Sequence, residues 1–166
     1  IVGVNTVIRD NPKLTVREGE KNPHDIVPKR VVIDANNRIP VDSHLMSVSD
    51  AETYLINAKM YDSGNDKSHV NRIVLPSEDG EIDVEKILDC LGDLEVQTLL
   101  VEGGLKTWNR FLKLKLVDSA HLCVSRMELD AKNRDYFHKN CLEDAGLILK
   151  EEITLGNDTI TKWERI

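Results

Sequence analysis

Short apolar runs and amphipathic spacings alternate along the chain and predict a sheet with helices packed against it. Runs such as 31–33 and 99–101 contain no polar residue, which is typical of strands buried on both faces of a sheet. Strands are predicted at residues 1–4, 30–34, 53–57, 72–75, 96–101 and 119–125. Apolar residues at helical spacing predict an amphipathic helix over 83–91, closed by Gly92, and a second helix over 106–115.

The two ends of the chain carry turn signals of different kinds. Asn5 is a candidate cap for a short helix over residues 6–9, which the Asp-Asn-Pro sequence at 10–12 ends. A Gly-Asn-Asp sequence at 156–158 interrupts the extended stretch 147–164 and predicts an antiparallel hairpin. Together these elements predict one α/β domain whose mixed sheet ends in antiparallel strands.

The composition narrows the function classes. A chain of 166 residues with 40% hydrophobic residues can bury one core and is too short for two ordinary domains. Its net charge of -7 disfavours nonspecific nucleic-acid binding, which needs a basic surface. No apolar stretch approaches the roughly 20 residues that span a bilayer, and no signal-peptide pattern opens the chain. We therefore expect a soluble, cytoplasmic protein that binds neither membrane nor nucleic acid.

The cysteines give no sign of a disulfide framework or a metal site. Cys90, Cys123 and Cys141 are odd in number and widely spaced. His121 and Cys123 would share one face of a strand, but two ligands do not make a tetrahedral zinc site. No metal is expected.

The segment 98–108 carries the clearest candidate chemistry. An apolar run ends in Glu102, Gly103 and Gly104, and an amphipathic helix follows. Glycines let a ligand's oxygens approach the backbone, and the start of the helix supplies unpaired N–H groups, so this corner is typical of a phosphate cradle. An acid beside such a cradle indicates a nucleotide and a second polar molecule bound side by side. The same sequence also fits a strand-to-helix turn whose glycines serve tight packing.

Three separated stretches of the chain match one known pattern. They are residues 3–17 (GVNTVIRDNPKLTVR), 30–40 (RVVIDANNRIP) and 101–104 (VEGG), the last followed by 111–112 (FL) and 116–118 (LVD). In order and separation they resemble the reductase domain of riboflavin biosynthesis. The resemblance implies a fold like that of dihydrofolate reductase, an α/β mixed sheet with flanking helices, here with a C-terminal antiparallel hairpin.

The resemblance also implies an activity. Members of this family use NADPH to reduce the ribose of a ribosylaminopyrimidine 5′-phosphate to the ribityl chain. The hydride would reach the anomeric carbon of the ring-opened imine form, a step that depends mainly on how the two reactants are placed. A small-molecule substrate and a homodimer are expected. Fusion to a deaminase domain, as in many bacterial members, and the choice between an aminated and a deaminated pyrimidine stay open.

Individual positions take roles from the matched motifs. Glu102 and Asp10 are the candidates for proton transfer. Leu14, Arg17 and Glu102 match substrate-binding residues, and a guanidinium suits a substrate phosphate. The cofactor-binding positions are Thr6, Asp10, Ala35, Gly103, Gly104, Leu105, Lys106 and Thr107. Without the resemblance, Arg17 fits a solvated surface residue and Asp10 a turn-capping aspartate.

Several departures from the family pattern limit the expected activity. The chain is expected to lack the family's amino-terminal strand and helix, so the activity of this segment alone stays open. Leu105 stands where a small residue or proline is common, and Ala35 stands where serine is common, which removes a side-chain hydrogen bond. Two alternatives therefore remain: an NADPH reductase of another pyrimidine or pterin-like substrate, and a noncatalytic relative that serves as a dimer partner or regulatory module.

Overall fold

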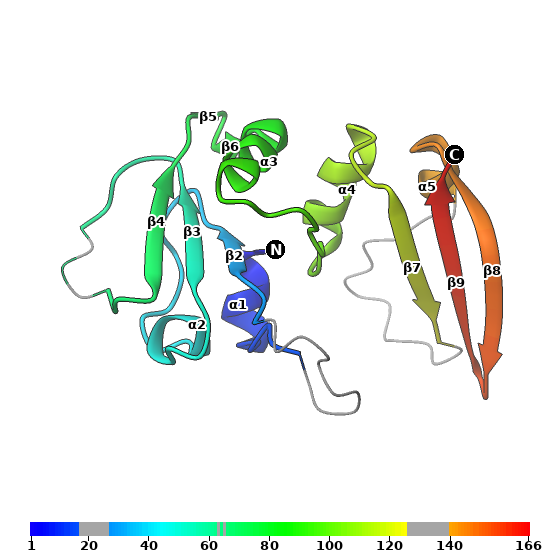
Figure 1. Cartoon of the computed structure of the whole chain (residues 1–166), viewed down its shortest axis with the longest axis horizontal. Coiled ribbons are helices and arrows are strands. Elements are labelled where there is room, and N and C mark those ends of the chain that lie inside the picture. The colour runs from blue at the N-terminus through cyan, green and yellow to red at the C-terminus, as the bar shows by residue number, and fades with distance from the viewer. Residues whose placement is uncertain (17–26, 63, 65, 126–139) are drawn as a thin grey trace. The chain divides into compact units, whose positions relative to one another are not determined.

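Four parallel strands form the first sheet, in the order β1-β2-β3-β4 (Figure 1). They span Val2–Gly3 (β1), Arg30–Ile33 (β2), Thr53–Asn57 (β3) and Val70–Val74 (β4). Most of β2 is buried, as its uninterrupted apolar run at 31–33 predicted, and all of β3 is buried as well. The predicted strands at 30–34, 53–57 and 72–75 are thus confirmed, with shifts of one or two residues at their ends.

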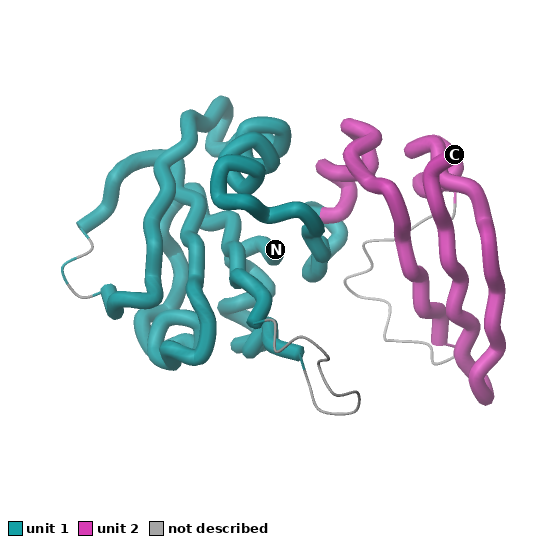
Figure 2. The backbone as a smooth tube through the Cα atoms, in the orientation of Figure 1, with its two compact units in different colours: residues 1–107 teal, residues 108–166 magenta. Residues whose placement is uncertain are grey.

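The structure is a computed structural model that describes residues 1–16, 27–62, 64, 66–125 and 140–166. Two compact units follow each other along the chain, residues 1–107 and 108–166 (Figure 2). The first sheet is accompanied by α1 (Val4–Asp10), α2 (His44–Ser47), β5 (Ser77–Glu78), β6 (Glu81–Ile82) and α3 (Val84–Asp93). The remaining elements are α4 (Leu105–Lys113), β7 (Ser119–Val124), α5 (Asn140–Asp144), β8 (Leu147–Leu155) and β9 (Asp158–Arg165). A single functional domain over 1–166 stays a prediction.

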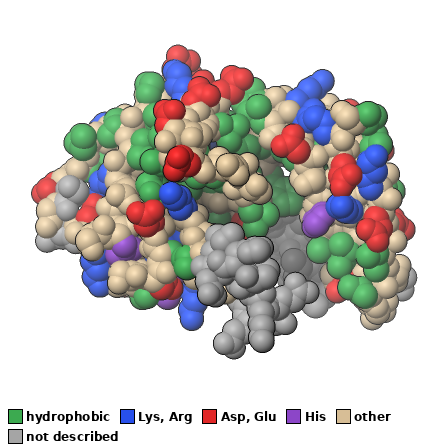
Figure 3. Space-filling model, in the orientation of Figure 1, with side chains coloured by type: hydrophobic (Ala, Val, Ile, Leu, Met, Phe, Trp, Pro, Cys, Tyr) green, Lys and Arg blue, Asp and Glu red, His purple; other side chains and the backbone are tan. Residues whose placement is uncertain are grey.

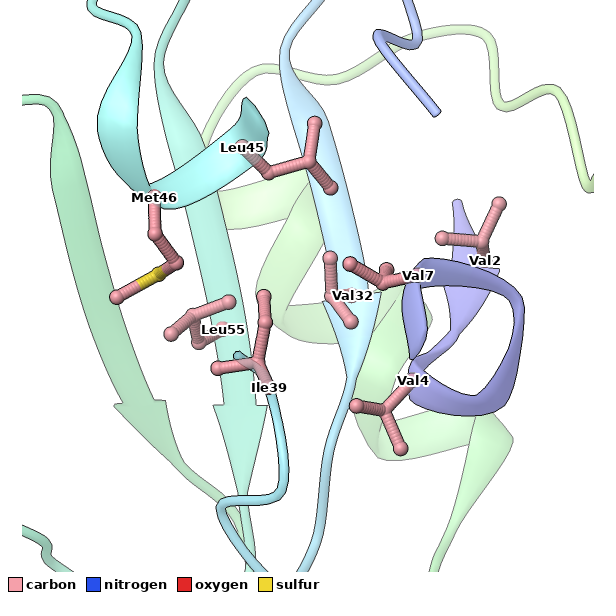
Figure 4. Packing of buried hydrophobic residues seen from close by; sticks show 8 residues of the cluster. All are labelled: Val2, Val4, Val7, Val32, Ile39, Leu45, Met46 and Leu55. Atoms are coloured by element: carbon pink, nitrogen blue, oxygen red, sulfur yellow. The ribbon is translucent and has the colours of Figure 1, made fainter. Parts of the chain in front are cut away.

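One apolar cluster joins α1 and α2 to the same face of the parallel sheet (Figure 4). Val2, Val32 and Leu55 lie opposite one another in the register of β1, β2 and β3, so they form a row across that face. The helices and the loop after β2 cover this row with Val4, Val7, Ile39, Leu45 and Met46. Full burial of each large apolar side chain stabilises the fold by roughly 1.5–3 kcal/mol, so this cluster fixes α1 against the sheet.

The start of α1 differs from the prediction. Gly3, in extended backbone with φ -79° and ψ 150°, is the N-cap, and no side chain caps the helix. Asn5 therefore lies inside the helix, and the prediction that it caps the helix is wrong. The end is confirmed, because Asn11 turns into the left-handed region with φ 41° immediately after the helix.

The end of α3 also differs from the prediction, because the helix continues through Gly92. The backbone N–H of Glu95 donates to the Gly92 carbonyl at 2.9 Å, and the N–H of Val96 donates to the Leu91 carbonyl at 3.0 Å. These two bonds form a Schellman motif, which needs a left-handed residue at its corner. Glu95 takes that conformation with φ 61°. The prediction that Gly92 closes the helix is therefore wrong.

A buried ion pair ties the carboxyl ends of the parallel strands to the loop after β2. Arg72 on β4 donates from Nε and Nη2 to the two carboxylate oxygens of Asp66, at 2.5 and 3.1 Å. Their side chains are only 9% and 12% exposed. The Nη1 group of Arg72 also donates to Asn37 at 2.7 Å and to Asn57 at 3.2 Å. The side-chain amide of Asn57 in turn donates to the Asp34 carbonyl at 2.7 Å.

A second buried guanidinium lies at the amino end of β2. Arg30 donates to the carboxylate of Asp50, to the hydroxyl of Thr53 and to two backbone carbonyls. Desolvation acts to raise the pKa of Asp50, but hydrogen bonds from Arg30 and His44 and the charge of Arg30 together lower it below its usual value. This pair stabilises the sheet at its amino edge.

The antiparallel sheet has the order β7-β9-β8 and confirms the predicted hairpin. Gly156 and Asn157 form its two-residue turn, and Gly156 has φ 62°, as the first central residue of a type II′ turn requires. One face of this sheet packs on α4 and α5 through Leu112, Leu142, Ala145, Leu147 and Trp163.

The buried ion pair gives a first prediction. Asp66→Ala leaves the guanidinium of Arg72 buried without its carboxylate, so the free energy of unfolding should fall by about 3 kcal/mol, measured by urea denaturation. Lys162→Gln is the control, because the Lys162–Glu164 pair lies on an exposed surface, and its unfolding midpoint should barely change. Similar small effects of both variants would show that the buried pair does not hold the strand ends.

The position of Gly92 gives a second prediction. An alanine there meets nothing within 4 Å and lies in the helix interior. Gly92→Ala should therefore raise the free energy of unfolding by about 0.5–1 kcal/mol. Gly156→Ala is the matched control, because its positive φ strains alanine, and it should lower the same quantity. A destabilised Gly92→Ala protein would instead place the end of α3 at Gly92.

Candidate functional site

The candidate site lies where β1 ends and α4 begins. β1 pairs with β2 on one side, and on the other side Ile1 contacts the segment before α4. The amino group of Ile1 donates to the Leu100 carbonyl at 2.7 Å, and the Glu102 N–H donates to the Ile1 carbonyl at 2.9 Å. Two bonds arranged around one residue in this way make a single step of a parallel ladder.

The predicted strand at 96–101 is wrong, because residues 96–101, all of which the structure describes, form no strand. β1 itself has only two residues, Val2–Gly3, and so offers a short edge. Leu100 is 70% exposed, where the apolar run predicted burial on both faces.

The strand order nevertheless changes direction at this place. From β1 the chain proceeds to β2 on one side, and it later returns to the other side of β1 at residues 100–102. In open α/β sheets, ligands bind at the carboxyl edge where the strand order reverses. Glu102, which is exposed, lies beside the end of β1 at this edge.

Two glycines allow α1 and the start of α4 to approach closely. A β-carbon on Gly103 would lie 2.9 Å from the hydroxyl oxygen of Thr6, and one on Gly3 would lie 2.9 Å from the hydroxyl oxygen of Thr107. Gly103 also has φ 114°, which side chains rarely adopt. The structure thus brings together Thr6, Gly103 and Thr107, which were predicted as cofactor residues from separate stretches. Sequence reasoning missed Gly3, although a glycine between a strand and a helix could have suggested it.

The second glycine of the pair is open to solvent. A β-carbon on Gly104 would meet nothing within 4 Å, and the residue is exposed. Leu105 begins α4 and is half-buried. The ammonium of Lys106 pairs with the carboxylate of Glu81 at 2.8 Å, on an exposed surface. Gly104 and Lys106 are thus both exposed in the predicted cradle.

Ala35 lies at the same edge, next to the end of β2. Its carbonyl accepts hydrogen bonds from the Ala58 N–H at 3.1 Å and from the Tyr61 hydroxyl at 3.3 Å. The preceding residue, Asp34, is fully buried, and its carboxylate accepts from the N–H groups of Arg38 and Ile39 at 2.9 Å each. These contacts fix the backbone of Ala35, whose side chain offers no hydrogen bond.

The remaining predicted residues are spread along α1 and the segment after it. Asp10 is exposed and lies four residues after Thr6, so it shares a helix face with Thr6 about 6 Å further along the axis. Leu14 has φ 51° and packs partly buried against the apolar cluster. Arg17 lies outside the described residues. Asp10 thus lies one helical turn from Thr6 on α1. The roles of Asp10, Leu14 and Arg17 stay predictions.

Charged side chains of both signs are interspersed on the face shown in Figure 3. None of the helices in the described parts of the chain is long and apolar enough to span a bilayer.

Comparison with known proteins shows which family has this arrangement. Residues 1–160 match the RibD C-terminal domain family. The riboflavin biosynthesis protein RibD of Chlamydia pneumoniae is 29% identical over 99% of this chain, which covers 45% of that protein. The 2,5-diamino-6-ribosylamino-4(3H)-pyrimidinone 5′-phosphate reductase of Methanothermobacter thermautotrophicus is 26% identical over 98% of this chain and 77% of its own length. The chain thus spans less than half of the RibD relative.

Solved structures show the same fold. The Saccharomyces riboflavin biosynthesis reductase Rib7 superposes with a TM-score of 0.75 at 19% identity, over 98% of this chain and 73% of that chain. At this identity the similarity establishes the fold. The predicted dihydrofolate reductase-like α/β architecture is therefore confirmed.

The close approach at Gly103 gives a third prediction. Gly103→Ala should lower the free energy of unfolding by about 1–3 kcal/mol, because alanine is strained at a positive φ and its β-carbon meets the Thr6 hydroxyl. Gly104→Ala, in open space, is the matched control and should change stability little. The double variant Gly103→Ala with Thr6→Ala should recover part of the loss. Equal stability of the two glycine variants would contradict the packing described here.

Proposed function

The chain belongs to the RibD C-terminal domain family, and from this membership we propose that it is an NADPH-dependent reductase of riboflavin biosynthesis. The proposed reaction reduces the ribose of a ribosylaminopyrimidine 5′-phosphate to a ribityl chain. The name of the archaeal relative, a pyrimidinone 5′-phosphate reductase, supports this substrate class. The observation that carries the proposal is the contact of Gly103 with Thr6, because it unites two separated parts of the matched region at one ligand-binding edge.

The residues at this edge fit a dinucleotide. The exposed backbone of Gly104 leaves room for a phosphate oxygen, and the first turn of α4 directs N–H groups toward the same place. Thr6 and Ala35 are proposed to contact the rest of the cofactor, one from α1 and the other from the end of β2. When bound, NADPH supplies the hydride.

The substrate is proposed to lie beside the cofactor, against Glu102. Leu14 and Arg17 are proposed to contact its sugar phosphate. Reduction of the imine form adds a hydride to the sugar carbon and a proton to the adjoining nitrogen, which converts the C=N bond to a single bond. Glu102, or Asp10 on the same side of the site, is proposed to supply that proton. The enzyme's main contribution is to hold the two reactants at near-attack distance.

We also infer that the full-length protein has a further strand beside residues 97–101. Leu99, Leu100 and Val101 in that stretch are apolar, and Leu100 is 70% exposed. A strand laid against the side of this segment away from β1 would bury the exposed leucine. The expected amino-terminal strand and helix of the family fit this position.

A homodimer in the cytoplasm is part of the same proposal. β8 is an edge strand of the antiparallel sheet and exposes Ile148, Leu149, Ile153 and Leu155. An edge strand offers backbone N–H and C=O groups to a further strand, and these four exposed apolar side chains favour association, so a second copy of the chain is the proposed occupant of this edge.

The proposal predicts NADPH oxidation by the full-length protein when a ribosylaminopyrimidine 5′-phosphate is added, measured by the absorbance of the reduced nicotinamide. The aminated and deaminated pyrimidines are tested separately. Glu102→Gln should lower kcat/KM by about 100-fold while the Kd for NADPH stays within about twofold. Glu85→Gln, on the exposed surface of α3, is the matched control and should leave kcat/KM unchanged.

The outcomes separate the alternatives. Binding of NADPH without oxidation by either pyrimidine would indicate a reductase of another pyrimidine or pterin-like substrate. Failure to bind NADPH would indicate a noncatalytic relative. An unchanged kcat/KM for Glu102→Gln would remove Glu102 from the reaction.

A further inference from the structure

The backbone takes two left-handed conformations in the segment that follows α1. Asn11 has φ 41° and ψ 55°, and its N–H donates to the Val7 carbonyl at 3.0 Å, which ends the helix. Three residues later Leu14 is left-handed as well, with φ 51°. Asparagine adopts this conformation more readily than most residues, whereas a bulky residue such as leucine rarely does. Such backbone persists only where the surrounding contacts hold it.

The side chain of Asn11 binds the first residue of α2, far along the chain. Its carboxamide oxygen accepts the backbone N–H of His44 at 2.8 Å. This N–H is one of those that a helix leaves unpaired at its start. Ser43 is the N-cap of α2, but its side chain accepts no N–H of the helix, and its hydroxyl has no hydrogen-bond partner in the described part of the chain. Asn11 therefore supplies a hydrogen bond that α2 does not provide for itself.

The helix to which Asn11 is bound is itself held on the sheet. Leu45 and Met46 of α2 belong to the apolar cluster that covers the parallel strands (Figure 4). Immediately after the helix, Arg30 donates to the Val48 carbonyl at 3.2 Å. The hydrogen bond from α2 thus ties Asn11 to a fixed part of the first unit.

Leu14 is held by the same part of the fold. Its side chain packs partly buried against the apolar cluster. The segment from Asn11 to Leu14 is therefore fixed at both ends, by a hydrogen bond to α2 at one end and by apolar packing at the other. Loss of the first contact would release the left-handed turn, and the backbone of Leu14 would no longer be held in one position.

We propose that Asn11 is a positioning residue of the reductase, whose hydrogen bond to α2 fixes the turn after α1 and thereby places Leu14 against the sugar phosphate of the substrate. This inference rests on the proposed function, in which Leu14 contacts the substrate. Asn11 is not proposed to touch either reactant. Its effect is confined to substrate binding, because the apolar cluster holds α1 and its cofactor residue Thr6 independently of this bond.

The first test removes the acceptor in the full-length protein. Asn11→Gly allows the left-handed conformation but has no side-chain oxygen. The KM for the ribosylaminopyrimidine 5′-phosphate should rise about fivefold, equivalent to about 1 kcal/mol, while kcat and the Kd for NADPH change by less than about twofold. Asn11→Asp keeps an oxygen acceptor and tolerates the same conformation, so its KM should stay within about twofold of the wild-type value.

The second test removes the donor. Proline suits the first position of a helix and lacks an N–H. Ser43 already has φ -60° and ψ 153°, which suit the residue before a proline. His44→Pro should therefore raise the KM by the same factor as Asn11→Gly, and the double variant should raise it no further. His44→Ala is the matched control, because it loses the contact of the ring with Asp50 at 3.3 Å but keeps the N–H, and its KM should not change.

These readouts separate a positioning role from a stabilising one. If Asn11→Gly and His44→Pro lower the free energy of unfolding and leave the KM unchanged, the bond only caps α2 and the inference is overturned. An equal rise of the KM and of the Kd for NADPH would also overturn it, because the effect would not be confined to the substrate. If the wild-type protein oxidises NADPH with neither pyrimidine, the proposed reductase function itself fails, and the role of Asn11 fails with it.

Discussion

The candidate site depends on the close approach of two chain segments that meet beside β1. Gly3, the last residue of β1, packs against Thr107, and Gly103 packs against Thr6. In both cases a β-carbon on the glycine would lie 2.9 Å from the hydroxyl oxygen of the threonine. The hydrogen bonds of Ile1 with Leu100 and Glu102 fix the position of the segment before α4 along β1. Any side chain at either glycine would separate α1 from the start of α4. The adjoining Gly104 has open space around it and an exposed backbone, which is the proposed place for an anionic ligand.

The rest of the first unit positions the strand ends around that contact. The apolar row of Val2, Val32 and Leu55 sets the register of the first three strands. Arg72, paired with Asp66, also donates to Asn37 in the loop after β2. These interactions are internal to the parallel sheet and involve no residue proposed to touch a ligand. The proposed ligand contacts instead come from residues just beyond the strands, where side chains and backbone are free to meet a nucleotide.

The sequence predicted those elements that local pattern decides. The continuous apolar run at 31–33 predicted β2, and the Gly-Asn turn predicted the hairpin of β8 and β9, because burial and turn geometry depend on a few adjacent residues. The apolar run at 99–101 has the same pattern as 31–33 but forms no strand, since pairing depends on a partner elsewhere in the chain. The end of α3 was misplaced because Glu95, and not a glycine, takes the left-handed corner. At the site, the matched motifs gave Thr6 and the diglycine, whereas the link from Tyr61 to Ala35 is a long-range contact that no local pattern shows.

We propose that the dinucleotide lies at the carboxyl edge between the diglycine corner and the end of β2. Hydrogen–deuterium exchange of the full-length protein with and without NADPH measures this placement. NADPH should slow exchange of the amides at residues 103–107 and at Ala35, and should leave exchange in β8 unchanged. Slowed exchange confined to the antiparallel sheet, with no change at residues 103–107, would contradict it.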